Sequence, residues 1–241
     1  MTNYLNTGYM NKVQWYSQDG IFDAIFAGKS VIRIGDGEIG LLNGGQVSYQ
    51  RYVQGLASEL KECIKRYKPD SPYILALPLF VEYSNRELRH TKGGIACWLP
   101  LKIMYRLIFN KKAQYMDAHF FYEKKNLDVL VSTFLIKKKI IINTTLENIR
   151  KIEKNNRNLD IVASVVSQTP NPYDLYLDTK QKISAIITEY KGDKKDVIIL
   201  CSSGPMGKVL AYYFTLRGIQ CIDIGLGIEQ FETNLHFEES I

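Results

Sequence analysis

Apolar positions along the chain fall into two kinds of segment that alternate from end to end. Short runs that are apolar almost throughout are typical of buried strands, and they occur at 30–34, 73–77, 139–142, 159–166, 196–201 and 220–224. Such continuous runs favour a parallel sheet that is covered on both faces, because a half-exposed strand would alternate apolar and polar residues.

Longer segments between these runs repeat apolar residues every three or four positions, as an amphipathic helix does. We expect helices at 13–29, 52–67, 95–109, 127–135, 146–153, 174–190 and 206–217. Strands that alternate with helices indicate an α/β fold with a Rossmann-like, mostly parallel sheet and helices on both faces. The pattern is weakest between about residues 80 and 135, and no repeat or linker divides the chain, so we expect a single domain over residues 1–241.

The clearest unit lies near the C-terminus. The strand Asp196–Cys201 is followed by the turn Ser202–Pro205, a helix over Met206–Arg217 that Gly218 closes, and the strand Gln220–Ile224. This order predicts a βαβ unit with a short turn at each end of its helix. Cys201 and Cys221 lie within these strands, where a cysteine is usually an inert core residue.

Polar residues follow four of the predicted strands. Asp36 and Glu38 follow 30–34, residues 143–145 follow 139–142, residues 202–204 follow 196–201, and Asp223 closes 220–224. Ligands of open parallel sheets bind at the carboxyl ends of the strands. If these strands are neighbours, all four groups converge on one edge of the sheet.

The segment Gly35-Asp36-Gly37-Glu38 allows two interpretations. Two carboxylates in an irregular turn can reach one hard divalent cation, and Arg33 can orient a carboxylate or pair with a phosphate. The glycines let the backbone bend or approach a ligand closely. Alternatively, Asp-Gly is an ordinary turn dipeptide and Glu38 begins the next helix. These residues alone do not decide between the two.

The segment Ser202–Lys208 has a different chemistry. Ser203 or Ser202 can cap the following helix, and Pro205 suits its first turn. Free N–H groups at such a helix start form a site for a diphosphate or a sugar, although capping alone would explain the same residues. The segment is neither GxGxxG nor GxxxxGK[ST], and we expect Lys208 on the solvent-facing side of its helix.

Several of these motifs together resemble one known family. They are R-I-G-D-G-E at 33–38, T-P-N-P-Y at 169–173, G-P-M-G-K-V-L-A-Y-Y-F at 204–214 and D-I-G at 223–225. In this order they resemble the bacterial glycosyltransferases of the GT-D fold type, first catalogued as a domain of unknown function. The resemblance spans nearly the whole chain, which makes the ordered set more specific than any one motif.

The resemblance implies a glycosyltransferase that moves a sugar from a nucleotide-sugar donor, of the UDP-glucose type, to a glycan, glycoprotein or lipid-linked acceptor. It implies that Asp36 and Glu38 form the catalytic DxE motif and bind Mn²⁺ (or Mg²⁺) at the donor diphosphate. From the chemistry of the two turns and the strand ends, we expect the donor to be bound by Arg33, Gly35, Gly37, Ser203, Gly204, Pro205 and Asp223.

Two features of the family pattern stay open. Members of the family often continue D-I-G-H, whereas Leu226 follows Gly225 here, which bears on metal affinity and donor choice. A base is needed if the transfer inverts configuration, and the candidates are Asp36, Glu38, Asp223 and Glu229.

Other functions fit parts of the sequence. A methyltransferase would have a glycine-rich loop without two carboxylates after its first strand, and a metal-dependent phosphoesterase would need more Asp and His ligands. The chain could also be a non-catalytic module that binds nucleotide sugars. No feature of the sequence distinguishes such a module from the enzyme.

The composition bears on metal binding and on the compartment in which the protein is found. The four cysteines form no CxxC pair, and with three histidines they give no zinc-ligand spacing. No apolar run approaches 18 residues, and the first 16 residues lack the apolar core of a signal peptide, so we expect a cytoplasmic protein.

Charge is unevenly distributed within the net +6. Residues 102–157 carry 13 Lys and Arg against 5 Asp and Glu. Such a surface attracts anions and suggests peripheral contact with anionic lipid at the inner membrane face. No aromatic interleaving or RNA-binding motif accompanies it, so we expect no nucleic-acid partner.

Overall fold

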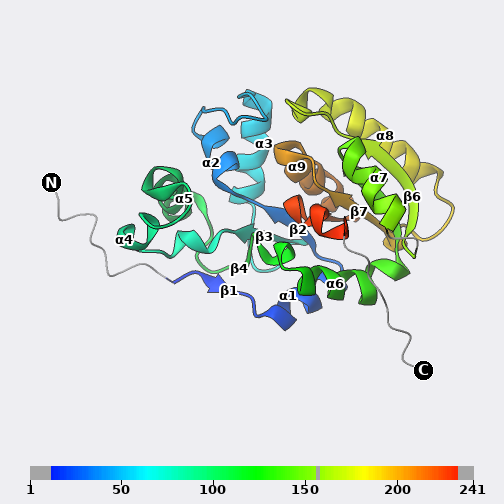
Figure 1. Cartoon of the computed structure of the whole chain (residues 1–241), viewed down its shortest axis with the longest axis horizontal. Helices are drawn as coiled ribbons and strands as arrows, with labels where there is room; N and C mark the ends of the chain where they lie inside the picture. The colour runs from blue at the N-terminus through cyan, green and yellow to red at the C-terminus, as the bar shows by residue number, and fades with distance from the viewer. Residues whose placement is uncertain (1–11, 156–157, 233–241) are drawn as a thin grey trace.

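The computed structural model describes residues 12–155 and 158–232. Within them, eight strands form one parallel sheet in the order β1-β4-β3-β2-β8-β7-β5-β6 (Figure 1). The strands are β1 (Gln14–Trp15), β2 (Ser30–Arg33), β3 (Tyr73–Leu77), β4 (Gln114–Asp117), β5 (Lys139–Thr144), β6 (Asp160–Val166), β7 (Val197–Cys201) and β8 (Gln220–Asp223). The predicted α/β fold with a parallel sheet is confirmed.

Helices cover both faces of this sheet. One face packs against α2 (Asp36–Leu42), α3 (Gln54–Lys65), α5 (Gly94–Ile108), α8 (Tyr176–Glu189) and α9 (Gly204–Thr215), and the other against α1 (Gln18–Phe26), α6 (Lys124–Thr133) and α7 (Leu146–Asn155). The short α4 (Asn85–Leu88) precedes α5. Alternate residues of one strand serve the two cores: Ile32 packs into the first and Val31 into the second.

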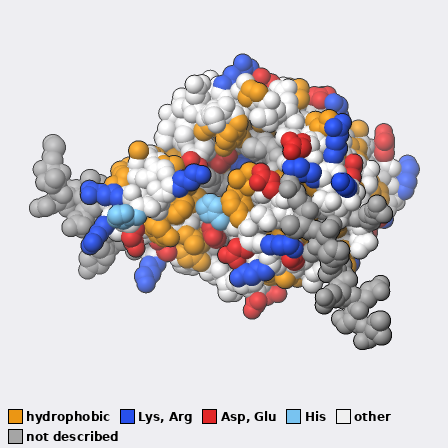
Figure 2. Space-filling model, in the orientation of Figure 1, with side chains coloured by type: hydrophobic (Ala, Val, Ile, Leu, Met, Phe, Trp, Pro, Cys, Tyr) orange, Lys and Arg blue, Asp and Glu red, His pale blue; other side chains and the backbone are white. Residues whose placement is uncertain are grey.

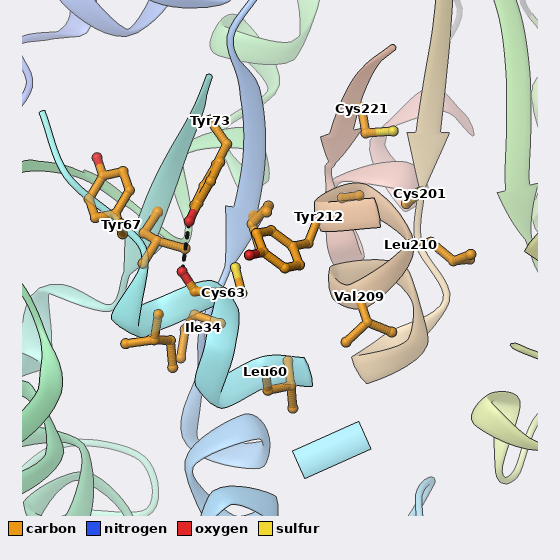
Figure 3. Close-up of a cluster of buried hydrophobic side chains, with 14 of the residues drawn as sticks. Ile34, Leu60, Cys63, Tyr67, Tyr73, Cys201, Val209, Leu210, Tyr212 and Cys221 are labelled. Atoms are coloured by element: carbon orange, nitrogen blue, oxygen red, sulfur yellow. Dashed lines mark hydrogen bonds between the residues drawn. The ribbon is translucent and has the colours of Figure 1, made fainter. Parts of the chain in front are cut away.

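Figure 3 shows the core between β2, α3 and α9, where Ile34, Leu60 and Val209 pack together. The Tyr73 hydroxyl donates to the carbonyl oxygen of Cys63 at 2.7 Å, which satisfies a buried polar group. Burial raises the pKa of the Cys201 and Cys221 thiols, so both are inert core residues as the sequence predicts.

Local structure differs from the predictions in two places. The segment 13–29 is not one helix, because Trp15 pairs with Tyr115 in the sheet and α1 begins only after Ser17, whose hydroxyl accepts from the N–H of Gly20. Strand β4, around Tyr115, was not predicted. It is four residues long and lies in the stretch with the weakest pattern.

The order of the four central strands positions the site. β2, β8, β7 and β5 are consecutive in the sheet, so the polar groups that follow them do converge on one edge. In the described ranges, no helix combines the length and apolar character needed to cross a bilayer.

Candidate functional site

A cleft of about 740 Å³ opens at the carboxyl edge of the central strands. Three groups of residues line it. One wall comes from β2, α2 and the neighbouring loops, and the second from the start of α9 and the segment 167–172. The third comes from α7 and the 3₁₀ segment η6 (Gly225–Glu232). The polar side chains on these walls include Arg33, Asp36, Tyr49, Tyr122, Thr145, Asn148, Lys151, Ser202, Ser203, Lys208 and Glu229.

Asp36 and Glu38 point to different surroundings. They occupy the first and third positions of α2, so their side chains leave the helix about 200° apart. Asp36 is exposed in the cleft and accepts from the Cys97 thiol at 3.2 Å. Burial and the Asp36 carboxylate raise the pKa of Cys97 to about 12, so this thiol stays protonated as a donor.

Glu38 is buried, and its carboxylate is occupied by protein groups. One oxygen accepts from the backbone N–H of Gly35 at 2.8 Å, as in a capping box, and the other lies 3.7 Å from Lys208 Nζ. Of the two predicted metal-binding carboxylates, the structure therefore places Asp36 on the cleft wall and Glu38 behind it.

A cluster of four buried charges lies below the cleft. The Lys208 ammonium is 3.1 Å from the Asp223 carboxylate, and Arg33 Nε is 3.5 Å from the same group. The side chains of Lys208 and Asp223 are only 6% and 1% exposed. With Glu38, the cluster contains two positive and two negative side chains. Each buried charge therefore has a neighbour of opposite charge that offsets the cost of its burial.

Asp223 is at the centre of this cluster. Burial by itself would raise the pKa of its carboxyl group, but the charges of Lys208 and Arg33 outweigh burial, and the net pKa is lowered. The Gly225 N–H donates to its second oxygen at 3.2 Å. The expected contact of Asp223 with the donor stays a prediction; in the structure its carboxylate is buried and pairs with Lys208 and Arg33.

Arg33 forms one edge of the cluster and reaches the cleft. Its guanidinium donates to the carbonyl oxygen of Ala118 at 2.9 Å and to the Tyr122 hydroxyl at 2.8 Å. A Cβ on Gly225, where φ is +48°, would lie 1.6 Å from Arg33 Nη2. Gly225 is therefore required both for its left-handed backbone and for the passage of Arg33.

Tyr49 bridges the first two walls. A Cβ on Gly37 would lie 2.7 Å from its hydroxyl and one on Gly204 3.4 Å from its ring, so both glycines make room for it. The Asn171 N–H donates to the Tyr49 carbonyl oxygen at 2.9 Å, which ties the loop to the segment 169–173. Burial, with Glu38 and Asp36 nearby, raises the pKa of Tyr49, so its hydroxyl remains a hydrogen-bond donor.

The start of α9 departs from the predicted capping. Ser203 stands at the N-cap, but its hydroxyl donates to Asn143 Oδ1 at 2.6 Å, and the Ser202 hydroxyl donates to the Gly225 carbonyl oxygen. Neither serine caps the helix through its side chain. Pro205 occupies the first turn as predicted.

Sequence reasoning missed several site residues, among them Lys208 and Tyr49. Lys208 was expected to face solvent and is buried instead; since its helix is apolar on nearly every side, it has no solvent-facing side for a lysine. Tyr49 lies in a loop, where no periodic pattern marks its direction. Leu226 and Glu229 are both exposed on the cleft wall formed by η6.

Comparison with known proteins connects this chain to a family. A family model described as "Glycosyltransferase GT-D fold" matches residues 31–240. Glycosyltransferase GlyD of Streptococcus pneumoniae serotype 4 (strain ATCC BAA-334 / TIGR4) is 27% identical over 218 residues, which cover 81% of this chain and 24% of GlyD. A probable glycosyl transferase, Gly, of Streptococcus gordonii is 23% identical over 217 residues, which cover 82% of this chain and 29% of Gly. The chain thus spans about a quarter of the length of these curated relatives.

Solved structures share the fold. A glycosyltransferase from Streptococcus sanguinis, described as containing domain of unknown function 1792, superposes with a TM-score of 0.73 at 19% identity, over 92% of this chain and 84% of its own. A second structure of this domain, described as having a distinct glycosyltransferase fold, gives 0.71 at 20% identity, over 92% and 81%. Because the family model covers most of its length, this chain belongs to the glycosyltransferases of the GT-D fold.

Proposed function

We propose that this chain transfers a sugar from a nucleotide-sugar donor of the UDP-glucose type to a glycan, glycoprotein or lipid-linked acceptor. The observation that carries the proposal is the arrangement of the cleft. The open carboxylate of Asp36 and the start of α9 line the same space, and Tyr49 lies between them. A diphosphate needs both a cation and N–H donors, and this arrangement supplies a place for each.

The start of α9 is suited to the donor diphosphate. Since no side chain caps this 12-residue helix, the N–H groups of its first turn are not occupied by Ser203. The helix dipole adds partial positive charge at the same end. In this proposal Gly204 lets a phosphate approach the backbone, while Gly35, Gly37 and Pro205 shape the walls without touching the donor.

The residues at Asp36 fit a hard cation such as Mn²⁺ or Mg²⁺ that is shared with the donor. Within residues 12–155 and 158–232, no group of three or more His, Cys, Asp or Glu side chains could hold a metal ion by itself. A cation here would therefore take Asp36 and complete its shell with phosphate oxygens and water, a common arrangement for Mg²⁺. When bound, it would neutralise charge that develops on the leaving diphosphate.

The buried cluster of Lys208, Arg33, Glu38 and Asp223 holds the residues of the cleft in position. Glu38 holds the Gly35 N–H and so sets the direction in which α2 presents Asp36. Of the four carboxylates named as candidate bases, only Asp36 and Glu229 line the cleft. We assign the cation to Asp36 and the removal of the acceptor hydroxyl proton to Glu229, which would apply to an inverting reaction.

Calorimetry with UDP-glucose and other UDP-sugars, with and without Mn²⁺, tests the proposal. We expect binding that Mn²⁺ strengthens in the wild type and in Asp19→Asn, and a loss of the Mn²⁺ dependence in Asp36→Asn. Asp19 is a matched control because it is an exposed carboxylate in the first turn of α1, outside the cleft. Equal Mn²⁺ dependence in both variants would refute the role of Asp36.

The same samples address the alternative functions. Family membership argues against the methyltransferase and the phosphoesterase. Tight UDP-sugar binding with no transfer or hydrolysis across a broad acceptor panel would instead indicate a non-catalytic binding module.

A further inference from the structure

The end of the molecule formed by α4 and α5 carries the whole net charge of the chain. Residues 83–116 contain seven Lys and Arg and a single acid, Glu87. The chain has 31 basic and 25 acidic residues in all, so the remainder holds 24 of each and is neutral. The one acid is engaged locally, because Glu87 accepts from the backbone N–H of Ser84.

Helix α5 also exposes apolar side chains on its outer side. Trp98, Leu101 and Tyr105 face the core, whereas Ile103 and Leu107, four residues apart, are 46% and 72% exposed. Side chains at this spacing lie on one face of a helix. Figure 2 shows hydrophobic and basic side chains gathered over α4 and α5, at the left of the view.

Exposed basic residues lie at the same end of the molecule as this apolar face. Those that are exposed in α4, in α5 and just beyond each helix are Arg86, Arg89, Lys92, Arg106 and Lys112. Lys102 does not join them, because its ammonium is turned inward onto the carbonyl oxygen of Tyr83. The face therefore combines exposed leucine and isoleucine with a rim of cations.

The rest of the basic segment 102–157 is different. Four of its lysines lie in ion pairs with nearby carboxylates: Lys124–Asp128, Lys125–Glu123, Lys139–Asp160 and Lys151–Glu147. Arg157 lies outside the described residues. The membrane contact expected over 102–157 is thus better supported over 83–116, where acids are scarce.

We propose that the outer face of α5 and its rim of cations dock on an anionic lipid bilayer. Basic residues attract acidic headgroups, and apolar side chains on a helix enter the boundary between headgroups and acyl chains. A glycan or nucleic acid would satisfy the cations but would leave Ile103 and Leu107 in water. A second copy of this chain would cover the apolar residues but would bring two strongly basic faces together.

Docking by this face would bring the cleft close to the lipid surface. Cys97 belongs to α5 and touches Asp36, so one helix separates the docking face from the cleft wall. Such a position suits an acceptor that is itself attached to lipid. The docking proposal does not depend on the proposed transfer, because a bilayer would recognise this face whatever reaction the cleft performs.

Flotation with vesicles tests the proposal on the full chain. We expect the protein to bind vesicles of phosphatidylcholine mixed with phosphatidylglycerol at low salt and to dissociate from them at high salt. It should not bind vesicles of phosphatidylcholine alone. The double variant Ile103→Ser/Leu107→Ser should bind at least tenfold more weakly, since both changes remove side chains that would enter the bilayer. Arg89→Gln/Lys92→Gln should lose roughly fivefold for each cation.

A matched control separates docking from general hydrophobicity. Leu177→Ser/Leu216→Ser also removes two exposed apolar side chains, 63% and 50% exposed, from α8 and the end of α9. This variant should bind as the wild type does. Thermal unfolding of each variant checks that it is folded, and UDP-sugar calorimetry, which should be unchanged, separates failure of docking from failure of the proposed function.

Three results would overturn the proposal. The wild type could fail to bind anionic vesicles at low salt, or the α5 double variant could bind as well as the wild type. Alternatively, the wild type could sediment as a dimer that the same variant dissociates, in which case a second copy covers this face.

Discussion

The substitution Lys208→Met examines the buried charge cluster most directly. Methionine keeps an unbranched, apolar side chain of similar length and removes the charged ammonium group. Lys208 Nζ lies 3.1 Å from Asp223 and 3.7 Å from Glu38, so its loss leaves two buried carboxylates with Arg33 as their one remaining cation in the cluster. The cluster then carries a net charge of −1.

The magnitude follows from the burial of the pair. Removing one partner of a buried ion pair costs about 3–5 kcal/mol, because the other charge is left without compensation in a poorly solvated site. Arg33 still pairs with Asp223, which places the expected loss near the lower end, at about 3 kcal/mol. For a chain of this size that loss corresponds to a decrease in Tm of roughly 6–12 °C.

Urea unfolding at pH 7, followed by circular dichroism, measures this free energy. Lys182→Met is a matched control, because Lys182 forms an exposed pair with Asp178 at 2.8 Å on α8. Exposed pairs of this kind contribute about 0.5 kcal/mol or less. Adding Asp223→Asn to Lys208→Met should recover part of the loss, since it removes the uncompensated charge. Equal destabilisation by the two lysine substitutions would refute the cluster as a buried ionic network.

Three further predictions concern neighbouring groups. Gly225→Ala should lose more than about 2 kcal/mol of stability, because the backbone is left-handed and the new Cβ displaces Arg33, whereas Gly218→Ala, with φ +76° and open space, should lose only about 1 kcal/mol. The pKa of Asp223 is lower in the folded state than its ordinary value of 3.8, so its stabilising contribution is complete above that pH and is lost as the pH falls through the folded-state pKa. Wild type and Asp223→Asn should therefore converge in unfolding free energy as acid is added, and a constant gap down to pH 2 would contradict this. Tyr49→Phe should weaken UDP-sugar binding about tenfold in calorimetry with little change in stability, and an equal loss in Tyr52→Phe, a tyrosine that does not line the cleft, would argue against a specific role.

Local patterns along the chain determine most of the fold. Continuous apolar runs identify β2, β3, β5, β6, β7 and β8. The inner strands are buried on both faces and therefore favour apolar residues throughout, whereas β6 is an edge strand that leaves Val162 and Val166 exposed. The turn residues after β7 and the glycine after α9 likewise mark a βαβ unit before any tertiary contact is known. From these patterns alone, the polar groups at the ends of β2, β5, β7 and β8 could be predicted to lie at one edge of the sheet.

Periodicity is less informative for short elements. Strand β1 has only two residues, and β4 has two apolar residues between Gln114 and Asp117, so neither shows a continuous apolar run. Their pairing depends on residues about 100 positions apart, such as Trp15 and Tyr115. That information becomes available only when the sheet forms.

The tertiary structure alone decided what each charged residue of the site does. Asp36 and Glu38 are equivalent as sequence, yet one opens into the cleft and the other is enclosed with Lys208, because two helix positions point in nearly opposite directions. Asp223 follows a strand end in the same way and is buried by the neighbours on both sides of β8. A carboxylate's function depends on the charges and the water around it, and these come from segments that the sequence places up to 190 residues away.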